Sequence, residues 1–524
     1  MQASEASPQL LRGWIDQAAR RHPDKPCIVS VEDGRTLTYR QLGELTGRIA
    51  AHLHERGLAI NDRVALLAEN SIEHLVCYFG VMAHGATICT IHVEMNRNHL
   101  ERILPAINPR LVLFEEGLDL DGVLAATSAP CLPLGTYDKV GGDGFYAAVG
   151  RCETDGGTLQ EAHEQNDAVI FFTSGTSDRP KGAVLTFREL LCNAVATADT
   201  FGIRADDRIY DFRSHNWCSA QVLSALAPLA RGATLILGRK FSRSRYFEHI
   251  KEYRATIATG NPTTVNMLLN GDEKTCCDDV PTLRFVTSSS APLLVEEWQR
   301  FEQRFGVRIS QGYGCSEIGW IAGNPGEERR LATVGKPLAY LKLSVVSREG
   351  QPLPAGEMGS VEVGGFDDNS YRYLAVDGTT QVNSYGRMKT GDLGFLDADG
   401  FLHLTGREKE LIIRGGVNIS PLEIDSLLMQ RPEVAEVATV GVPDRIYGEE
   451  VVSYVVLRPG TTVAADEILR YCSSVLPAFK APKKIVLSQA LPKTERGKLD
   501  RKALVERWRT EDGGRRTDKH QDNV

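Results

Sequence analysis

The chain has 524 residues, more than one hydrophobic core usually serves, so we expect one large domain and at least one smaller one. Its composition, with 42% hydrophobic and 24% charged residues, is that of a soluble globular protein and excludes a disordered or fibrous one. The net charge of -8, with no long block of Lys and Arg, excludes nucleic acid as a partner.

The first residues, Met1 to Pro23, carry charges among their apolar side chains and predict an amphipathic helix rather than a signal peptide. No apolar run is long enough to cross a membrane. The eleven cysteines are scattered, and the one close group, Cys276 and Cys277, lacks the spacing of metal-ligand pairs. We therefore expect a cytoplasmic protein with reduced cysteines and no transmembrane segment.

From Ile28 onward, apolar segments alternate with amphipathic stretches, a pattern typical of parallel strands joined by helices. Residues 63–68 and 168–172 are predicted strands, and residues 42–53 are a predicted helix. The main body is therefore predicted to be an α/β domain with parallel-type sheets.

The segment after residue 350 has a different pattern. Residues 351–356 predict a turn, and the alternating residues 359–363 predict a strand in a small β-rich subdomain. Past a second turn at 397–400, the pattern restarts as a helix at 421–429 followed by strands at 436–442 and 451–457. This restart predicts a separate, small α+β domain.

A loop rich in hydroxyl groups and glycine, residues 173–182, follows the predicted strand 168–172. Its donors are the hydroxyls of Thr173, Ser174 and Thr176, the backbone around Gly175 and the ammonium of Lys181. Such a loop suits a polyphosphate, because inward N–H groups and one cation neutralise crowded phosphates. Taken alone, the same string also fits a solvated surface loop, and Pro180 breaks the pattern of a P-loop NTPase.

Five further motifs follow in order along the chain: Gln311-Gly-Tyr-Gly-Cys-Ser-Glu317, Lys389-Thr-Gly-Asp392, Gly406-Arg-Glu-Lys-Glu-Leu-Ile412, Gly415-Gly-Val-Asn-Ile-Ser-Pro421 and Pro492-Lys-Thr-Glu-Arg-Gly-Lys498. Together with the first loop they resemble the adenylate-forming superfamily of acyl-CoA synthetases, peptide-synthetase adenylation domains and luciferases. The resemblance runs from about Leu10 to Trp508. It is closest to the bacterial carboxylic acid–CoA ligases.

The resemblance implies an N-terminal domain (1–406) that binds ATP and the acyl group and a mobile C-terminal domain (407–508). The tail (509–524) is polar and lacks periodicity, so we expect it to be disordered. The hinge between the two domains is expected near Lys409, where one residue absorbs a large backbone change while the small domain swings.

The resemblance also implies the ATP site. Its residues are expected to be Thr173, Ser174, Gly175, Thr176, Lys181, Ser290, Ala291, Pro292, Gly312, Tyr313, Asp392, Arg407 and Lys498. Tyr313 is expected against adenine, Asp392 on the ribose hydroxyls, and Arg407 on the same nucleotide from the domain junction. Relatives usually have Gly-Ala-Ala-Pro where this chain has Ser289-Ser-Ala-Pro292, so added side chains there are expected to narrow the site.

The expected catalytic residues are Lys498, Glu317, Ser316 and Thr176. Lys498 matches the lysine that bridges the attacking carboxylate and the α-phosphate, where a compact ammonium neutralises two anions. Glu317 and Thr176 match the ligands of Mg²⁺, which needs only one or two carboxylates beside phosphate oxygens. Gly415 and Gly416 are expected to form part of the tunnel for coenzyme A.

The acyl pocket is expected to contain Arg213, His215, Trp217 and Cys218, and to take a small to medium acid. Relatives carry Pro-Leu-Phe-His in this region, so Arg213 is the unexpected residue. It pairs either with a polar or anionic group of the substrate or with a carboxylate in a structural salt bridge. Amino-acid-activating relatives place an Asp near His215, and its absence is expected to exclude an α-amino acid.

The predicted function is an ATP-dependent carboxylic acid–CoA ligase. The acid first displaces pyrophosphate from ATP and forms an acyl-adenylate, and the thiol of coenzyme A then displaces AMP. One alternative is a ligase that passes the acyl group to a carrier protein or another acceptor. Another is a catalytically silent nucleotide-binding protein. The sequence leaves the oligomeric state open, with a homodimer among the outcomes.

Overall fold

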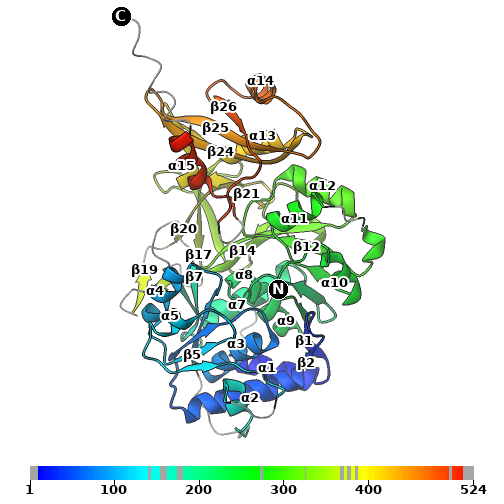
Figure 1. The fold of residues 1–524 in the computed structure, drawn as a ribbon, viewed down its shortest axis with the longest axis vertical. Coiled ribbons are helices and arrows are strands. Elements are labelled where there is room, and N and C mark those ends of the chain that lie inside the picture. The colour runs from blue at the N-terminus through cyan, green and yellow to red at the C-terminus, as the bar shows by residue number, and fades with distance from the viewer. Residues whose placement is uncertain are drawn as a thin grey trace, which may run out of the picture.

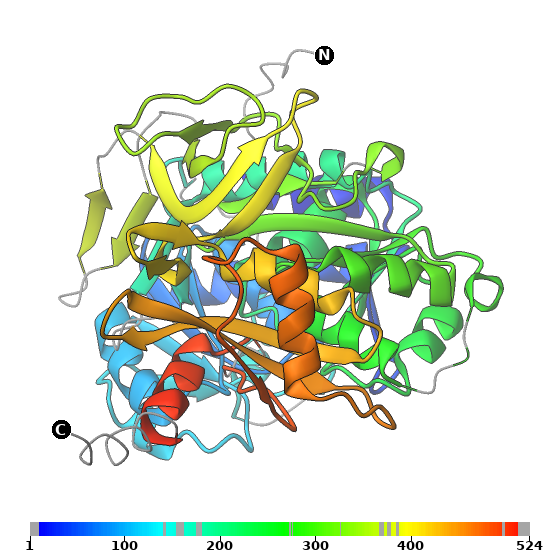
Figure 2. The same ribbon diagram turned by 90° about the horizontal axis from the view of Figure 1, so that it is seen from above.

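The computed structural model describes residues 10–139, 143–153, 162–173, 181–271, 274, 276–324, 326–365, 371–374, 379–383, 387–494 and 498–511. Figure 1 shows a large lower body, which contains most of the chain, and a smaller unit above it that includes helix α15. Seen from above, the smaller unit lies across the body (Figure 2). Among these residues, no helix is long and apolar enough to cross a membrane.

Two large sheets form the body. In the described residues, the first has nine strands in the order β15 (Lys336–Pro337), β14 (Gly319–Gly323), β13 (Ile309–Cys315), β12 (Phe285–Ser288), β11 (Ile257–Ala258), β9 (Arg208–Asp211), β10 (Thr234–Leu237), β1 (Pro26–Ser30) and β2 (Thr36–Thr38). The six strands from β13 to β1 are parallel, and the outer strands are antiparallel.

The second sheet has eight strands within the described ranges, in the order β19 (Thr380–Asn383), β18 (Tyr371–Leu374), β8 (Lys181–Thr186), β7 (Asp167–Thr173), β4 (Thr87–Ile91), β3 (Arg63–Leu67), β5 (Leu111–Phe114) and β6 (Cys131–Pro133). Strands β7 to β6 are parallel, whereas β8, β18 and β19 add in antiparallel order. The expected α/β body is therefore present, with mixed rather than purely parallel sheets.

Helices cover both faces of each sheet. The central layer contains α1 (Leu11–Arg21), α2 (Tyr39–Glu55), α3 (Ile72–His84), α6 (Phe145–Val149), α7 (Phe187–Thr200), α8 (Cys218–Ala220), the π-helical η1 (Gln221–Leu226) and α9 (Ala227–Arg231). The first sheet is covered on its other face by α10 (Tyr246–Glu252), α11 (Pro262–Leu269) and α12 (Val295–Phe305), and the second by α4 (Arg97–Ile107) and α5 (Asp121–Leu124).

Strand β3 shows why these layers form. Val64 and Leu66 pack into the central core, while Ala65 and Leu67 pack into the core under α4 and α5. Side chains of a strand alternate between faces, so a continuous apolar run is suited to a strand that is covered on both sides. The apolar run at 63–68 therefore specifies a central strand.

Within the described residues, a four-stranded antiparallel sheet joins the body to the smaller unit. Its strands are β16 (Lys342–Val346), β17 (Gly359–Gly364), β20 (Met388–Leu396) and β21 (Leu402–Arg407). This sheet corresponds to the β-rich subdomain expected around residues 351–363.

The C-terminal unit has five described strands: β23 (Val417–Ile419), β22 (Ile412–Arg414), β25 (Gly448–Leu457), β24 (Val434–Asp444) and β26 (Lys484–Leu487). Helices α13 (Pro421–Met429) and α14 (Ala465–Val475) cover one face, and α15 (Arg501–Glu511) covers the other. Helix α15 extends three residues past 508, the boundary that we placed from the sequence. Residues 512–524 lie outside the described part of the chain.

Candidate functional site

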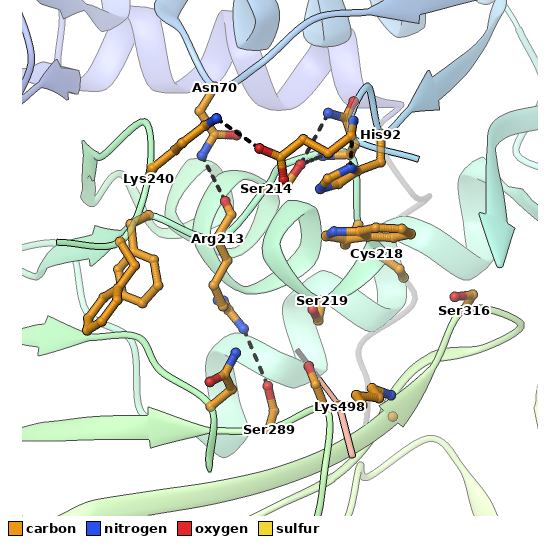
Figure 3. A pocket seen from close by; sticks show the side chains of 18 of the residues that line it. Asn70, His92, Arg213, Ser214, Cys218, Ser219, Lys240, Ser289, Ser316 and Lys498 are labelled. Carbon is orange, nitrogen blue, oxygen red and sulfur yellow. Dashed lines mark hydrogen bonds and ion pairs between the residues drawn. The ribbon is translucent and has the colours of Figure 1, made fainter. Parts of the chain in front are cut away.

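Two cavities meet at Lys498. The larger, about 1140 Å³, lies between the body and the C-terminal unit, and the smaller, about 440 Å³, lies inside the body. Lys498, Ser290 and Gly314 line both cavities. Figure 3 shows Lys498 at one end of the smaller cavity, with Arg213, Asn70 and Lys240 farther along it. A ligand that spans both cavities therefore passes the Lys498 side chain.

The larger cavity contains most of the residues that we predicted for the nucleotide. These are Ser290, Ala291, Pro292, Gly312, Tyr313, Asp392, Arg407 and Lys498. They come from four separate parts of the chain: the segment after β12, strand β13, the β20–β21 pair and the stretch before α15. The structure thus brings together side chains that are up to about two hundred residues apart in the sequence.

Asp392 is the centre of a small polar group in this cavity. It lies opposite Arg407 in the β20–β21 ladder, and the Arg407 Nε donates to its Oδ1 over 2.8 Å. The Tyr313 hydroxyl donates to its Oδ2. Burial, and then the charge of Asp392, raises the pKa of Tyr313, so this phenol remains a donor. Arg407 is half exposed, as expected for a side chain beside a ligand.

The segment after β12 is strained at Ser290, whose φ is +76°. This left-handed region is unfavourable for residues other than glycine, and such strain concentrates at binding sites. Its neighbour Ser289 is buried, and its hydroxyl accepts a hydrogen bond from the Arg213 Nη1 over 3.4 Å. Ser290 places its side chain where the two cavities join.

Glu317 and Lys181 meet through Tyr373, a residue that sequence reasoning missed. The Tyr373 hydroxyl donates to the Glu317 Oε1 over 2.7 Å, and the Lys181 Nζ lies 5.3 Å from the centre of the Tyr373 ring. Neither Glu317 nor Lys181 lines either of the two cavities described above, whereas Ser316 lines the smaller one. Tyr373 belongs to no recognisable sequence motif. Only the antiparallel pairing of β18 with β8 brings it to this site.

The base of the predicted phosphate loop lies beside Tyr373 and Glu317. Thr173 at the end of β7 is the register partner of Lys181 at the start of β8. Ser174, Gly175 and Thr176 lie outside the described residues, so their predicted contacts with phosphate and metal remain predictions. Both ends of the loop are therefore anchored beside Glu317.

Asn70, which follows β3, organises the wall of the smaller cavity. Its Nδ2 donates to the carbonyl oxygens of Arg213 and Gly238, and its Oδ1 accepts from the backbone N–H of His215. The sequence did not identify Asn70, because a single Asn in a loop forms no motif with a characteristic spacing. The same side chain lines the cavity.

Arg213 forms a structural salt bridge, one of the two alternatives that we left open. Its Nη2 lies 2.7 Å from the Asp211 Oδ2. Burial alone would raise the pKa of Asp211, but the charge and hydrogen bonds of Arg213 lower it overall. Thr259 and Ser224 also donate to this carboxylate. Arg213 lines the cavity, yet its charge is already matched within the protein.

The premise that no Asp lies near His215 was wrong. Asp211 is only four residues away in sequence and its charge acts on His215. It is nevertheless fully buried, and Arg213, Thr259 and Ser224 occupy both of its oxygens. Asp211 therefore has no lone pair directed at a substrate ammonium, for a reason that only the structure supplies.

His215 does not line the smaller cavity, contrary to our expectation. It is fully buried behind Asn70, and its carbonyl accepts from the Gln221 Nε2 over 2.6 Å. Burial lowers the pKa of His215 to about 4, so it is neutral near pH 7. It supports the lining from behind Asn70 and forms no part of the cavity wall.

Trp217 and Cys218 line the smaller cavity as predicted. The Trp217 ring is stacked on His92, with their ring centres 4.7 Å apart. Burial raises the pKa of Cys218, so its thiol stays protonated and serves as a small apolar group. His92, on the connection after β4, was not found from the sequence.

The remaining predicted residues lie in the C-terminal unit. Lys409 is in the 3-10 helix η4 (Glu408–Glu410), at the first residues after β21. Gly415 and Gly416 form the turn between β22 and β23, with φ of +58° and +82°. Neither glycine lines the cavities at Lys498 in this arrangement.

Comparison with known proteins matches both parts of the chain to one family. Residues 15–367 match the profile of AMP-binding enzymes, and residues 423–498 match that of the AMP-binding enzyme C-terminal domain. The chain is 31% identical to a sulfoacetate–CoA ligase of Cupriavidus necator, over 94% of this chain and 97% of the relative. It is 29% identical to an oxalate–CoA ligase of Arabidopsis thaliana, over 95% and 98% of the two chains.

Among solved structures, the fold matches ATP-bound MatB from Rhodopseudomonas palustris. The TM-score is 0.85 with 26% identity, over 96% of this chain and 99% of MatB. The mixed α/β body with a small C-terminal domain is therefore the architecture of that structure as well.

Proposed function

The chain belongs to the AMP-binding enzyme family as an ATP-dependent acid–CoA ligase, and from this premise we propose how its own residues divide the work. The observation that carries the proposal is the position of Lys498, which lines both the nucleotide cavity and the smaller cavity. We assign the smaller cavity to the acid and the larger one to ATP. The reacting atoms then meet at Lys498.

In the first step, a carboxylate oxygen of the acid forms a bond to the α-phosphorus of ATP, and the bond to pyrophosphate breaks. Both partners are anions, so their approach is opposed by charge repulsion. A lysine ammonium between them offsets this repulsion and stabilises the charge that develops at phosphorus. Asp392, Arg407 and Tyr313 support this step by holding the nucleoside end of ATP in the larger cavity.

The phosphates belong at the loop base beside Glu317 and Lys181. A Mg²⁺ ion fits this donor set, because a carboxylate and phosphate oxygens are the ligands that it prefers. It would neutralise phosphate charge when bound, and Glu317 and Thr176 are the residues assigned to hold it. Tyr373 orients Glu317 by donating to one of its oxygens, which leaves the other oxygen for a ligand.

In the second step, the sulfur of coenzyme A attacks the acyl carbonyl of the adenylate, and AMP leaves. Gly415 and Gly416 line neither of the cavities at Lys498, so we assign this step to another domain orientation. Apolar side chains beside these glycines are exposed: Ile413, Val417, Ile446 and Tyr447. An exposed apolar patch supports a surface that becomes covered in a second arrangement, with rotation at Lys409.

The acid is proposed to be small to medium in size. A cavity of about 440 Å³ that is shared with Lys498 supports this limit. Its walls combine the aromatic pair His92 and Trp217 with polar groups such as Asn70 and Ser214, so a polar or partly aromatic acid fits better than a long alkyl chain.

A screen of carboxylic acids tests the proposal. Purified protein would be given ATP, Mg²⁺ and each acid, with coenzyme A, a carrier protein or no acceptor, and pyrophosphate and thioester would be measured separately. We expect acid-dependent pyrophosphate release and an acyl-CoA product. Thioester on the carrier protein alone would favour the alternative acceptor, and no acid-dependent pyrophosphate exchange would favour a silent nucleotide-binding protein.

The cellular location and the assembly remain proposals of the same kind. We propose a cytoplasmic enzyme, because its substrates ATP and coenzyme A are intracellular metabolites and its described cysteines are unpaired thiols. The homodimer remains a prediction, which light scattering on the purified chain would decide.

A further inference from the structure

Three side chains with metal-binding atoms meet far from the cavities at Lys498. His52 and Glu55 lie on α2, and Cys152 follows α6. Helix α2 lies at the lower end of the molecule in Figure 1, opposite the C-terminal unit. We propose that His52, Glu55 and Cys152 form a binding site for a zinc-type divalent cation, with water as a further ligand.

The distances between these atoms suit tetrahedral coordination. The Cys152 Sγ lies 3.6 Å from the His52 Nδ1 and 3.5 Å from the Glu55 Oε2. Zinc–ligand bonds of about 2.0–2.3 Å at tetrahedral angles place neighbouring ligand atoms about 3.3–3.6 Å apart. All three ligand atoms lie within 4.8 Å of one another, so side-chain rotations can bring them around one cation.

The local fold sets this arrangement. Residues three apart on a helix lie on one face, so His52 and Glu55 point to the same side of α2. The backbone N–H of Cys152 donates to the Val149 carbonyl over 3.1 Å, which holds the thiol close to the end of α6. The His52 ring packs edge-on against the ring of Phe145 on α6, with 5.7 Å between ring centres.

The protonation states of His52 and Cys152 suit a metal ion that binds the imidazole and displaces the thiol proton. Burial, and then the charge of Arg56, lowers the pKa of His52, so its imidazole is neutral and able to ligate near pH 7. Burial, and then the hydrogen bond and charge of Glu55, raises the pKa of Cys152. Without metal the thiol therefore keeps its proton, and binding releases that proton into solution.

The charge balance selects the kind of cation. A thiolate and the Glu55 carboxylate together match a dication, while Arg48, Arg56 and Arg151 act on these groups and oppose any positive charge. Mg²⁺ and Ca²⁺ prefer oxygen ligands and gain little from sulfur or imidazole. Zinc and similar ions gain a strong thiolate bond, which offsets the repulsion from the arginines.

Cobalt(II) tests the site, because it takes zinc positions and reports thiolate ligation by a charge-transfer band. Cys276 and Cys277 are adjacent and exposed and would bind cobalt themselves, so the full chain would carry Cys276→Ser and Cys277→Ser. We expect this background to show the thiolate band and tetrahedral d–d bands, and Zn²⁺ to abolish both. The apparent affinity should rise with pH, because a proton is released.

Single changes in the same background assign the ligands. Cys152→Ser should remove the thiolate band, and Glu55→Gln, at an exposed residue, should weaken binding at least about tenfold. His52→Gln should do the same, with His54→Gln as the matched control, since His54 is exposed on the same helix. A parent without the thiolate band, a band that survives Cys152→Ser, or equal effects of the two histidine changes would overturn the proposal.

Discussion

At the scale of single residues, charge placement explains the site better than residue type does. Lys498 and Arg213 are both cations that line the smaller cavity. Arg213 is matched by the fully buried Asp211, whereas Lys498 lies where the two cavities meet. The first position stabilises the fold, and the second is suited to reacting anions.

Replacement of Lys498 by Ala should separate the two half-reactions. We expect acid-dependent pyrophosphate exchange to fall by at least about 10²-fold, because a preorganised charge at the transition state is lost. Formation of thioester from a supplied acyl-adenylate and coenzyme A should be nearly unchanged. Lys484→Ala, on β26 of the same unit, is the control, and equal losses in both half-reactions of K498A would disprove the assigned role.

Replacement of Arg213 by Leu should destabilise the protein by about 3–5 kcal/mol, because it leaves the buried Asp211 charge without its partner. Thermal or urea unfolding measures this change. Arg231→Leu breaks an exposed pair with Asp199 and should cost less than about 1 kcal/mol. Addition of Asp211→Asn to R213L should recover part of the loss. A stable R213L protein with an altered acid profile would instead favour a role in substrate binding.

At the scale of secondary-structure elements, the contact between α12 and α13 connects the body to the C-terminal unit. Glu297 of α12 is 6% exposed, and the Asn266 Nδ2 donates to its Oε1. The charged groups that act on it are Glu436 of β24, Arg300 and Glu296, and the charge of Arg458 interacts with it as well. Burial, and then Glu436, raises the pKa of Glu297 to about 7. The Glu297 and Glu436 carboxylates, one from the body and one from the C-terminal unit, thus repel each other when both are ionised.

This contact predicts a pH dependence of stability. Between about pH 4.5 and pH 7, the folded chain keeps a proton on Glu297 that the unfolded chain loses, so stability falls as pH rises through this window. The Glu297→Gln variant lacks this loss and should exceed the parent by about 3 kcal/mol above pH 7, at about 1.4 kcal/mol per pKa unit. Thermal unfolding across pH measures it. An advantage of E297Q that does not shrink toward pH 5 would contradict the assignment.

At the scale of the whole molecule, the two steps place different demands on one pair of domains. The described arrangement brings Lys498 to the cavities and leaves the surface around Gly415 uncovered. Ile446 on this surface is 83% exposed. A side chain with so few contacts contributes almost nothing to the stability of this domain arrangement. Its apolar character is better explained by burial in a second domain arrangement.

Replacement of Ile446 by Ser tests that second arrangement. Stability and pyrophosphate exchange should stay unchanged, while the rate of thioester formation should fall several-fold, because apolar burial is lost only in the other orientation. Val475→Ser, at another exposed apolar residue of the same unit, is the matched control. If I446S slows both half-reactions alike, or V475S has the same effect, the surface has no role specific to the second step.

The sequence by itself determined the order of elements, the two-part organisation and the family. Apolar runs and their periodicity identified strands such as 63–68 and the helix 421–429, because those patterns arise from local geometry. Motifs such as Tyr313 to Glu317 identified the chemistry, since ATP and a carboxylate require the same side chains wherever they bind. Six such motifs in order were sufficient for the resemblance.

Only the tertiary structure decided which of those residues meet. It moved His215 out of the cavity wall, matched Arg213 with Asp211, and added Asn70 and Tyr373 to the site. These outcomes depend on strand register and on packing between segments far apart in the chain, and no local pattern encodes them. Burial then sets the protonation of each group, because the energy of a charge depends on all the atoms around it.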